Sequence, residues 1–220
     1  MKKSTLKRIL LWTGIIVILG LIVVGAAFLA VKNQTNPTNI GALTPEVSSS
    51  DHITGNPNAK VTVVEYADFQ CPACEAYYPL LKQLTTDYKD KIRFVYRHFP
   101  LPQHPNALPT ALASEAASNQ GKFWEMHDLL FEKHAEWQDL KDSTSVLLGY
   151  AKQLNLDVTK FQSDMNGTTT RKVVDDDAAS AVTENLPGTP SFFVNGTYIK
   201  NPQSYQEFKS ILDNELSKTQ

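Results

Sequence analysis

Two cysteines three positions apart are the residues in this sequence best suited to chemistry. Cys71 and Cys74 are the only cysteines among the 220 residues, so the chain offers them no other disulfide partner. A Cys-x-x-Cys spacing is typical of thiol–disulfide exchange sites, and it also supplies half of a four-ligand zinc site. The spacing alone is therefore compatible with two chemistries, redox exchange and zinc binding.

The flanking residues place this pair at the start of a helix. Residues 61–66 predict a buried strand, and residues 76–84 predict an amphipathic helix. If Cys71 is the helix cap, Pro72 takes the first helical position, where its missing N–H costs nothing. The unpaired amides and the positive end of the helix dipole then favour a thiolate and lower the pKa of Cys71. We expect Cys71 to be exposed and nucleophilic, and Cys74 to be more buried and to close or resolve the disulfide.

Zinc is the less favoured interpretation because the sequence lacks a full set of ligands. A structural zinc site needs four, yet there is no second Cys-x-x-Cys to complete the set. We interpret His104 and His127 as structural or surface residues, since a capped thiolate needs no histidine base. The three aspartates at 175–177 cannot all point at one ion from a helix, so we expect a solvated acidic face. The sequence thus predicts no cofactor and no metal ion at the cysteines, and it leaves open whether an ion binds elsewhere.

Three runs of sequence resemble the DsbA-like thiol-disulfide oxidoreductase family of the thioredoxin superfamily. These are residues 55–61, 65–74 and 188–196. The resemblance covers nearly everything from about residue 55 to the end of the chain. It implies an α/β thioredoxin fold with an inserted helical subdomain. It also implies a cis peptide bond between Thr189 and Pro190 that lies against the cysteine pair.

The resemblance also assigns roles to two residues outside the cysteine motif. The Thr189 backbone, exposed by a cis bond, would pair with a substrate peptide beside Cys71. Glu65, six positions before Cys71, matches a buried acid behind the cysteines, where a raised pKa would let it shuttle the proton of Cys74. The alternative is an edge position or a lysine partner for Glu65.

The hydropathy pattern of residues 55–220 predicts one domain with this organisation. Apolar residues within 91–100 predict a second core strand, parallel to the first and joined to it by the helix after Cys71. Residues from about 105 to 185 carry helical patterns and predict the inserted subdomain. Residues 191–199, with an Asn-Gly turn, predict a hairpin, and residues 204–216 predict a closing helix.

The first 54 residues predict an anchor and a tether. Residues 1–8 are basic, and residues 9–31 are a charge-free, mostly apolar run long enough to cross a bilayer as a helix. A cleaved signal peptide is the alternative, but its apolar region is usually shorter, about 7 to 15 residues. Residues 32–54 are polar and rich in turn-forming residues, which predicts a flexible linker. We expect a single-pass cell-membrane protein with a cytoplasmic basic tail and the catalytic domain outside.

These patterns predict a membrane-anchored extracytoplasmic thiol-disulfide oxidoreductase that introduces disulfides into exported proteins through Cys71 and Cys74. Its partners would be exported proteins with thiols and a membrane redox partner that reoxidises the pair. A net charge of −2 without a basic patch predicts no nucleic-acid binding. Two alternatives stay open: a disulfide reductase or isomerase that uses the same site, and a tethered binding module without turnover.

Overall fold

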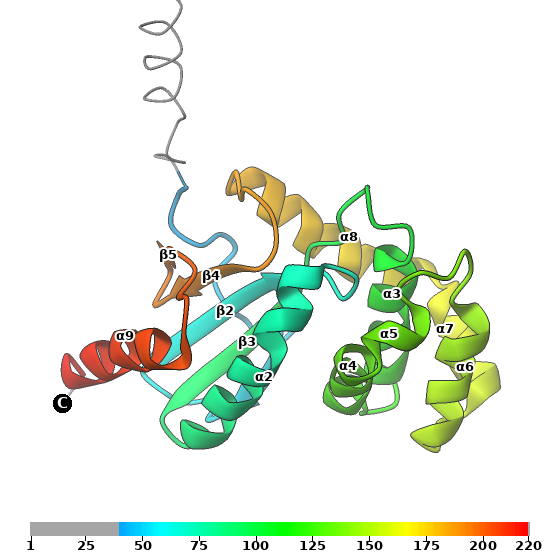
Figure 1. Ribbon diagram of the computed structural model, residues 1–220, viewed down its shortest axis with the longest axis horizontal. Helices are drawn as coiled ribbons and strands as arrows, with labels where there is room; N and C mark the ends of the chain where they lie inside the picture. The colour runs from blue at the N-terminus through cyan, green and yellow to red at the C-terminus, as the bar shows by residue number, and fades with distance from the viewer. Residues whose placement is uncertain (1–39, 220) are drawn as a thin grey trace, which may run out of the picture. The chain divides into compact units, whose positions relative to one another are not determined.

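The computed structural model describes residues 40–219, which fold around a five-stranded mixed sheet with the strand order β1-β3-β2-β4-β5 (Figure 1). Strands β2 and β3 are parallel and are joined by α2, whereas the β1–β3, β2–β4 and β4–β5 pairs are antiparallel. The elements in chain order are β1 His52–Gly55, β2 Val61–Ala67, α2 Pro72–Asp87, β3 Ile92–His98, α3 Ala107–Ser118, α4 Phe123–Glu132, α5 His134–Trp137, α6 Thr144–Gln153, α7 Val158–Met165, α8 Thr168–Thr183, β4 Ser191–Val194, β5 Thr197–Ile199 and α9 Tyr205–Ser217.

The central strand β2 is buried along its whole length because helices pack on both faces of the sheet. Its side chains alternate between these faces, as the pleat requires. Val61 and Val63 pack with residues of α2 and α9, and Val64 and Tyr66 pack in a cluster that includes Ala181 of α8. The carboxyl end of β2 leads directly to the cysteine pair.

The helical insertion lies between β3 and the end of α8, within the predicted range of about 105–185. Figure 1 shows helices α3 to α7 grouped to one side of the sheet. Their own apolar core includes the fully buried Trp137, whose indole N–H donates to the Leu130 carbonyl at 3.0 Å. This core also takes in Phe69 and both cysteines, so the insertion packs against the loop that carries them.

The hairpin of β4 and β5 has the turn that its sequence predicts. Asn195 and Gly196 both have positive φ, 48° and 77°, as a type I′ turn demands. The strand pair therefore closes at the predicted position and brings Pro190, at the head of β4, to the end of the sheet that carries the cysteines.

The predicted linker, residues 32–54, differs from the structure over residues 40–54. Leu43 is buried and its N–H donates to the Gly196 carbonyl at 2.9 Å. Asp51 pairs with Arg97 at 2.7 Å, and β1 adds an edge strand beside β3. Scattered apolar residues reach the core here without any periodicity, which is why composition alone predicts a tether.

The predicted anchor, residues 9–31, lies outside the described residues. Among residues 40–219 the structure contains no helix with both the length and the apolar character needed to span a bilayer.

Candidate active site

Cys71 caps the amino terminus of α2, as the sequence predicts. Its backbone is extended, with φ −71° and ψ 121°, and Pro72 is the first helical residue. A turn closed by the Cys71 N–H and the Asp68 carbonyl, 3.0 Å apart, joins β2 to the helix. The first-turn amides of α2 therefore face the Cys71 sulfur with no backbone partner of their own.

The Cys71 sulfur meets the loop that precedes β4. Its Sγ lies 3.4 Å from the Thr189 carbonyl oxygen, and the Thr189–Pro190 peptide bond is cis, as the resemblance implies. Segments 118 residues apart in sequence thus meet at one sulfur atom. The Thr189 backbone lies beside Cys71, in the position expected for pairing with an extended peptide.

The two cysteines are both free thiols in the structure, and they differ in exposure. Cys74 is 1% exposed and Cys71 is 6% exposed, so the predicted order of burial is confirmed. The expectation of a well-exposed Cys71 is wrong, because the chain before Pro190 and the apolar core of the insertion cover most of the side chain. What remains open is a small area of Cys71 at the end of the sheet.

The surroundings push the pKa values of the two thiols in opposite directions. A hydrogen bond from the Cys74 thiol, with further hydrogen bonds from the amides of Cys74 and Ala73, lowers the pKa of Cys71 to about 5 against the opposing effect of burial. Burial, and then the hydrogen bond to Cys71 and its charge, raise the pKa of Cys74 well above its ordinary value. At neutral pH the pair therefore holds one thiolate, at Cys71, and one proton, at Cys74.

Glu65 lies on β2 behind the cysteines and is 2% exposed. Burial, and next the charge on Cys71, raise its pKa to about 8. The structure therefore favours the buried carboxyl group over the edge or lysine-paired alternative. Glu65 and Cys74 line the same open cavity, with Lys82 and Asp128 also in its wall. A carboxyl group that titrates near neutral pH and shares a cavity with Cys74 is suited to proton exchange with that thiol.

Asp68 is a site residue that the sequence interpretation missed. Its fully buried carboxylate accepts hydrogen bonds from the Gln70 N–H at 2.8 Å, the Leu101 N–H at 3.0 Å and His104 Nδ1 at 2.6 Å. These bonds fix the loop before Cys71 to the chain that follows β3. His104 is thus structural, as expected. An acid just after a buried strand was the available signal.

The three consecutive aspartates do not converge, as expected. Asp175 pairs with Arg171 and Asp176 with Lys172, each one turn away on α8. Asp177 instead accepts the His98 backbone N–H at 2.9 Å.

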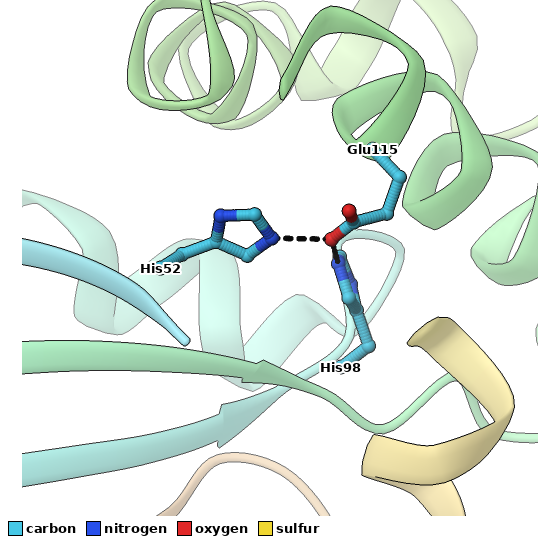
Figure 2. A group of neighbouring side chains, drawn as sticks. All are labelled: His52, His98 and Glu115. Atoms are coloured by element: carbon cyan, nitrogen blue, oxygen red, sulfur yellow. Dashed lines mark hydrogen bonds and ion pairs between the residues drawn. The ribbon is translucent and has the colours of Figure 1, made fainter. Parts of the chain in front are cut away.

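The structure also brings together a set of metal-ligating side chains that sequence spacing does not reveal. His52, His98 and Glu115 come from β1, β3 and α3, and their side chains converge (Figure 2). We call this set the His–Glu cluster. Motif spacing finds ligands that are close along the chain, and these three are far apart.

The fold and this site define a protein of the thioredoxin superfamily with a cysteine pair at the start of α2. A family model described as thioredoxin matches residues 48–214, so the chain belongs to that family. The structure superposes on α-DsbA1 of Wolbachia pipientis with a TM-score of 0.70, at 22% identity and over 78% of this chain and 94% of that one. It also superposes on oxidised BdbD of Bacillus subtilis with a TM-score of 0.68, at 26% identity, over 76% and 93%. Within the superfamily, the chain is DsbA-like.

A further relative carries a different name. The chain is 42% identical over 158 residues to Na(+)/H(+) antiporter NhaA 1 of Salinispora arenicola. The match covers 71% of this chain and 23% of the relative, so the chain spans about a quarter of the length of the curated relatives it matches. The name therefore describes a much longer protein, and the shared part is the region that carries the cysteine pair.

Proposed function

We propose that this protein is a membrane-anchored thiol–disulfide oxidoreductase that introduces disulfides into exported proteins through Cys71 and Cys74. The observation that supports this most directly is the divergence of the two thiol pKa values, with that of Cys71 lowered to about 5 and that of Cys74 raised. An acidic thiol stabilises the reduced form of the pair and so makes its disulfide a stronger oxidant.

The reaction follows from the oxidised pair. A substrate thiolate attacks Cys71 Sγ, the Cys71–Cys74 bond breaks, and Cys74 leaves with the electron pair and takes a proton from Glu65 through the shared cavity. A second substrate thiolate then attacks the substrate sulfur of the mixed disulfide, which forms the product disulfide and releases the Cys71 thiolate. Two electrons pass from the substrate to the cysteine pair, and Glu65 regains its proton from solvent. An oxidant in the membrane would have to accept the two electrons to complete the cycle.

The lowered pKa of Cys71 favours a pair that oxidises its substrates over one that reduces them. With a pKa of about 5, ionisation of Cys71 at pH 7 stabilises the reduced form by on the order of 2.7 kcal/mol. For a two-electron couple this is about 60 mV. The same pair would act as a reductase toward any substrate disulfide with a higher potential than its own.

The membrane location depends on residues 9–31, whose apolar run is the support for an anchor. An anchor of this kind would hold the domain outside the cell membrane, near newly exported chains and near the redox partner that reoxidises it.

The test is the reduction potential of the full chain, together with its activity on a reduced, unfolded substrate that has two cysteines. We expect a potential about 60 mV or more above about −270 mV, in the direction of the about −120 mV of a strong oxidant, and disulfide formation in the substrate. A potential near the lower value would make the protein a reductase. Absence of any exchange, with Cys74→Ser also unable to trap a mixed disulfide, would make it a binding module.

A further inference from the structure

The His–Glu cluster is a compact, buried set of donor atoms. Figure 2 shows the two imidazole rings pointing at one carboxylate. The Nε2 atoms of His52 and His98 both hydrogen-bond Oε1 of Glu115, the second at 2.8 Å. The side chains are 13%, 1% and 7% exposed for His52, His98 and Glu115. One nitrogen from each ring and one carboxylate oxygen all lie within 4.8 Å of one another.

Packing holds the two rings in this orientation. The His52 ring stacks on Phe123 with centroids 3.5 Å apart, and the His98 ring meets Tyr96 edge-on at 5.2 Å. Among the described residues, His98 Nδ1 finds no hydrogen-bond partner, so this ring interacts with polar atoms only through the nitrogen that points into the cluster. Ligands fixed before binding lose little conformational entropy when an ion arrives.

The donor types select the class of ion. Two imidazole nitrogens and one carboxylate oxygen are the protein ligands of many zinc sites, in which water or another ligand takes the fourth position. Imidazole suits first-row transition metals, whereas calcium and magnesium prefer sites made entirely of oxygen. Opening the two hydrogen bonds by small rotations would place an ion where the three donor atoms now meet.

A cation also has a route to the cluster. A separate open cavity is lined by His52 together with one guanidinium and four carboxylates, which belong to Arg97, Glu46, Asp51, Asp176 and Asp177. Acidic walls raise the local concentration of cations. This cavity is not the one that Glu65 and Cys74 line.

We propose that His52, His98 and Glu115 bind one divalent transition-metal ion of the zinc class. The ion would join β1 and β3 of the sheet to α3 of the helical insertion. Water would complete the four ligands, because the protein supplies only three. The ion would link the insertion to the sheet, and it takes no part in electron transfer. The site is independent of the cysteine pair, so it would remain if the proposed redox function were wrong.

The experiment uses the full chain in detergent, with Cys71→Ser and Cys74→Ser to remove the thiols as competing ligands. The protein is stripped of metal and titrated with zinc chloride, and bound zinc is counted after dialysis. We expect one zinc ion per chain. At a free zinc concentration of 100 times the dissociation constant, Tm should rise by roughly 5 to 10 °C, while calcium and magnesium chloride leave Tm unchanged.

Variants then locate the site. His52→Gln and Glu115→Gln keep polar side chains of similar size and should each lower the zinc affinity at least tenfold. His134→Gln is the matched control, because His134 is a buried histidine outside the cluster, and it should bind zinc as the parent does. If either cluster variant fails to fold, X-ray absorption at the zinc edge of the parent protein should still report two imidazole ligands.

Two results would overturn the proposal. One is a parent protein that binds no zinc and shows no rise in Tm at micromolar metal. The other is zinc whose affinity is the same in His52→Gln and Glu115→Gln as in the parent, or whose absorption spectrum lacks imidazole ligands.

Discussion

The cysteine site and the His–Glu cluster are both buried groups of ionisable side chains, but they combine different charges. At the cysteine site, Cys71, Cys74 and Glu65 are all acids, so a negative charge on one opposes a negative charge on the others. In the His–Glu cluster, one acid accepts hydrogen bonds from two imidazoles. The neighbouring acids of the cysteine site drive their pKa values apart, which leaves Cys71 as a nucleophile. The imidazoles and the carboxylate of the His–Glu cluster instead satisfy one another's hydrogen bonds. Reactivity is therefore expected in the first region and stability in the second.

The largest expected effect is the loss of exchange in Cys71→Ser. Without the thiolate no mixed disulfide forms, so oxidation of a reduced peptide should fall to the uncatalysed rate. Cys74→Ser should instead accumulate the mixed disulfide, which non-reducing electrophoresis detects. Equal behaviour of the two variants would contradict the assignment of Cys71 as the nucleophile.

Glu65→Gln tests whether Glu65 is buried as a neutral acid, through the pH dependence of the free energy of unfolding. The folded pKa of Glu65 is about 8 and its ordinary value is 4.5, so the folded state holds a proton that the unfolded state has lost between these values. The wild type should therefore lose stability relative to Glu65→Gln as the pH rises from 4.5 to 8, by on the order of 4 kcal/mol. Urea unfolding of the reduced proteins at a series of pH values measures the difference. Parallel pH profiles would show that Glu65 is not buried as a neutral acid.

Glu115→Ala tests the complementary cluster. Removal of the carboxylate leaves two buried imidazoles without their acceptor and should cost about 3 kcal/mol of unfolding free energy. The exchange rate per folded molecule should stay that of the wild type, because the cluster does not contact either cysteine. Denaturant unfolding and a peptide oxidation assay on the same sample separate the two effects. A large loss of activity in fully folded protein would show that the two regions are coupled.

Lys82→Met should have the smallest effect. Lys82 lines the cavity behind Cys74 but is 47% exposed, and it pairs with Glu132 at 2.5 Å on the surface. An exposed ion pair contributes about 0 to 1 kcal/mol, so Tm should shift by no more than a few degrees. A larger fall in Tm, measured by thermal unfolding, would mean that the Lys82 charge stabilises the acids of the cysteine site.

The sequence predicts the parts of this molecule that local chemistry determines. The cap at Cys71, the first helical position of Pro72 and the Asn195–Gly196 turn each follow from residue types within a few positions. The contact between Cys71 and Thr189 was expected only from the family resemblance, because the two segments meet only after folding. The hydrogen bonds that Asp68 accepts also join distant segments, and no local pattern predicted them. Residue types gave the order of burial of the two thiols, but not how far the chain before Pro190 covers Cys71. The ordered segment 40–54 was missed because its apolar residues follow no period.

The most direct test of the account is the titration of the Cys71 thiol in the reduced full chain, followed through its rate of alkylation as a function of pH. We predict a single thiolate with a midpoint near pH 5, absent in Cys71→Ser and retained in Cys74→Ser at a higher pH. A Cys71 that keeps its proton above about pH 8, as an ordinary thiol does, would contradict it.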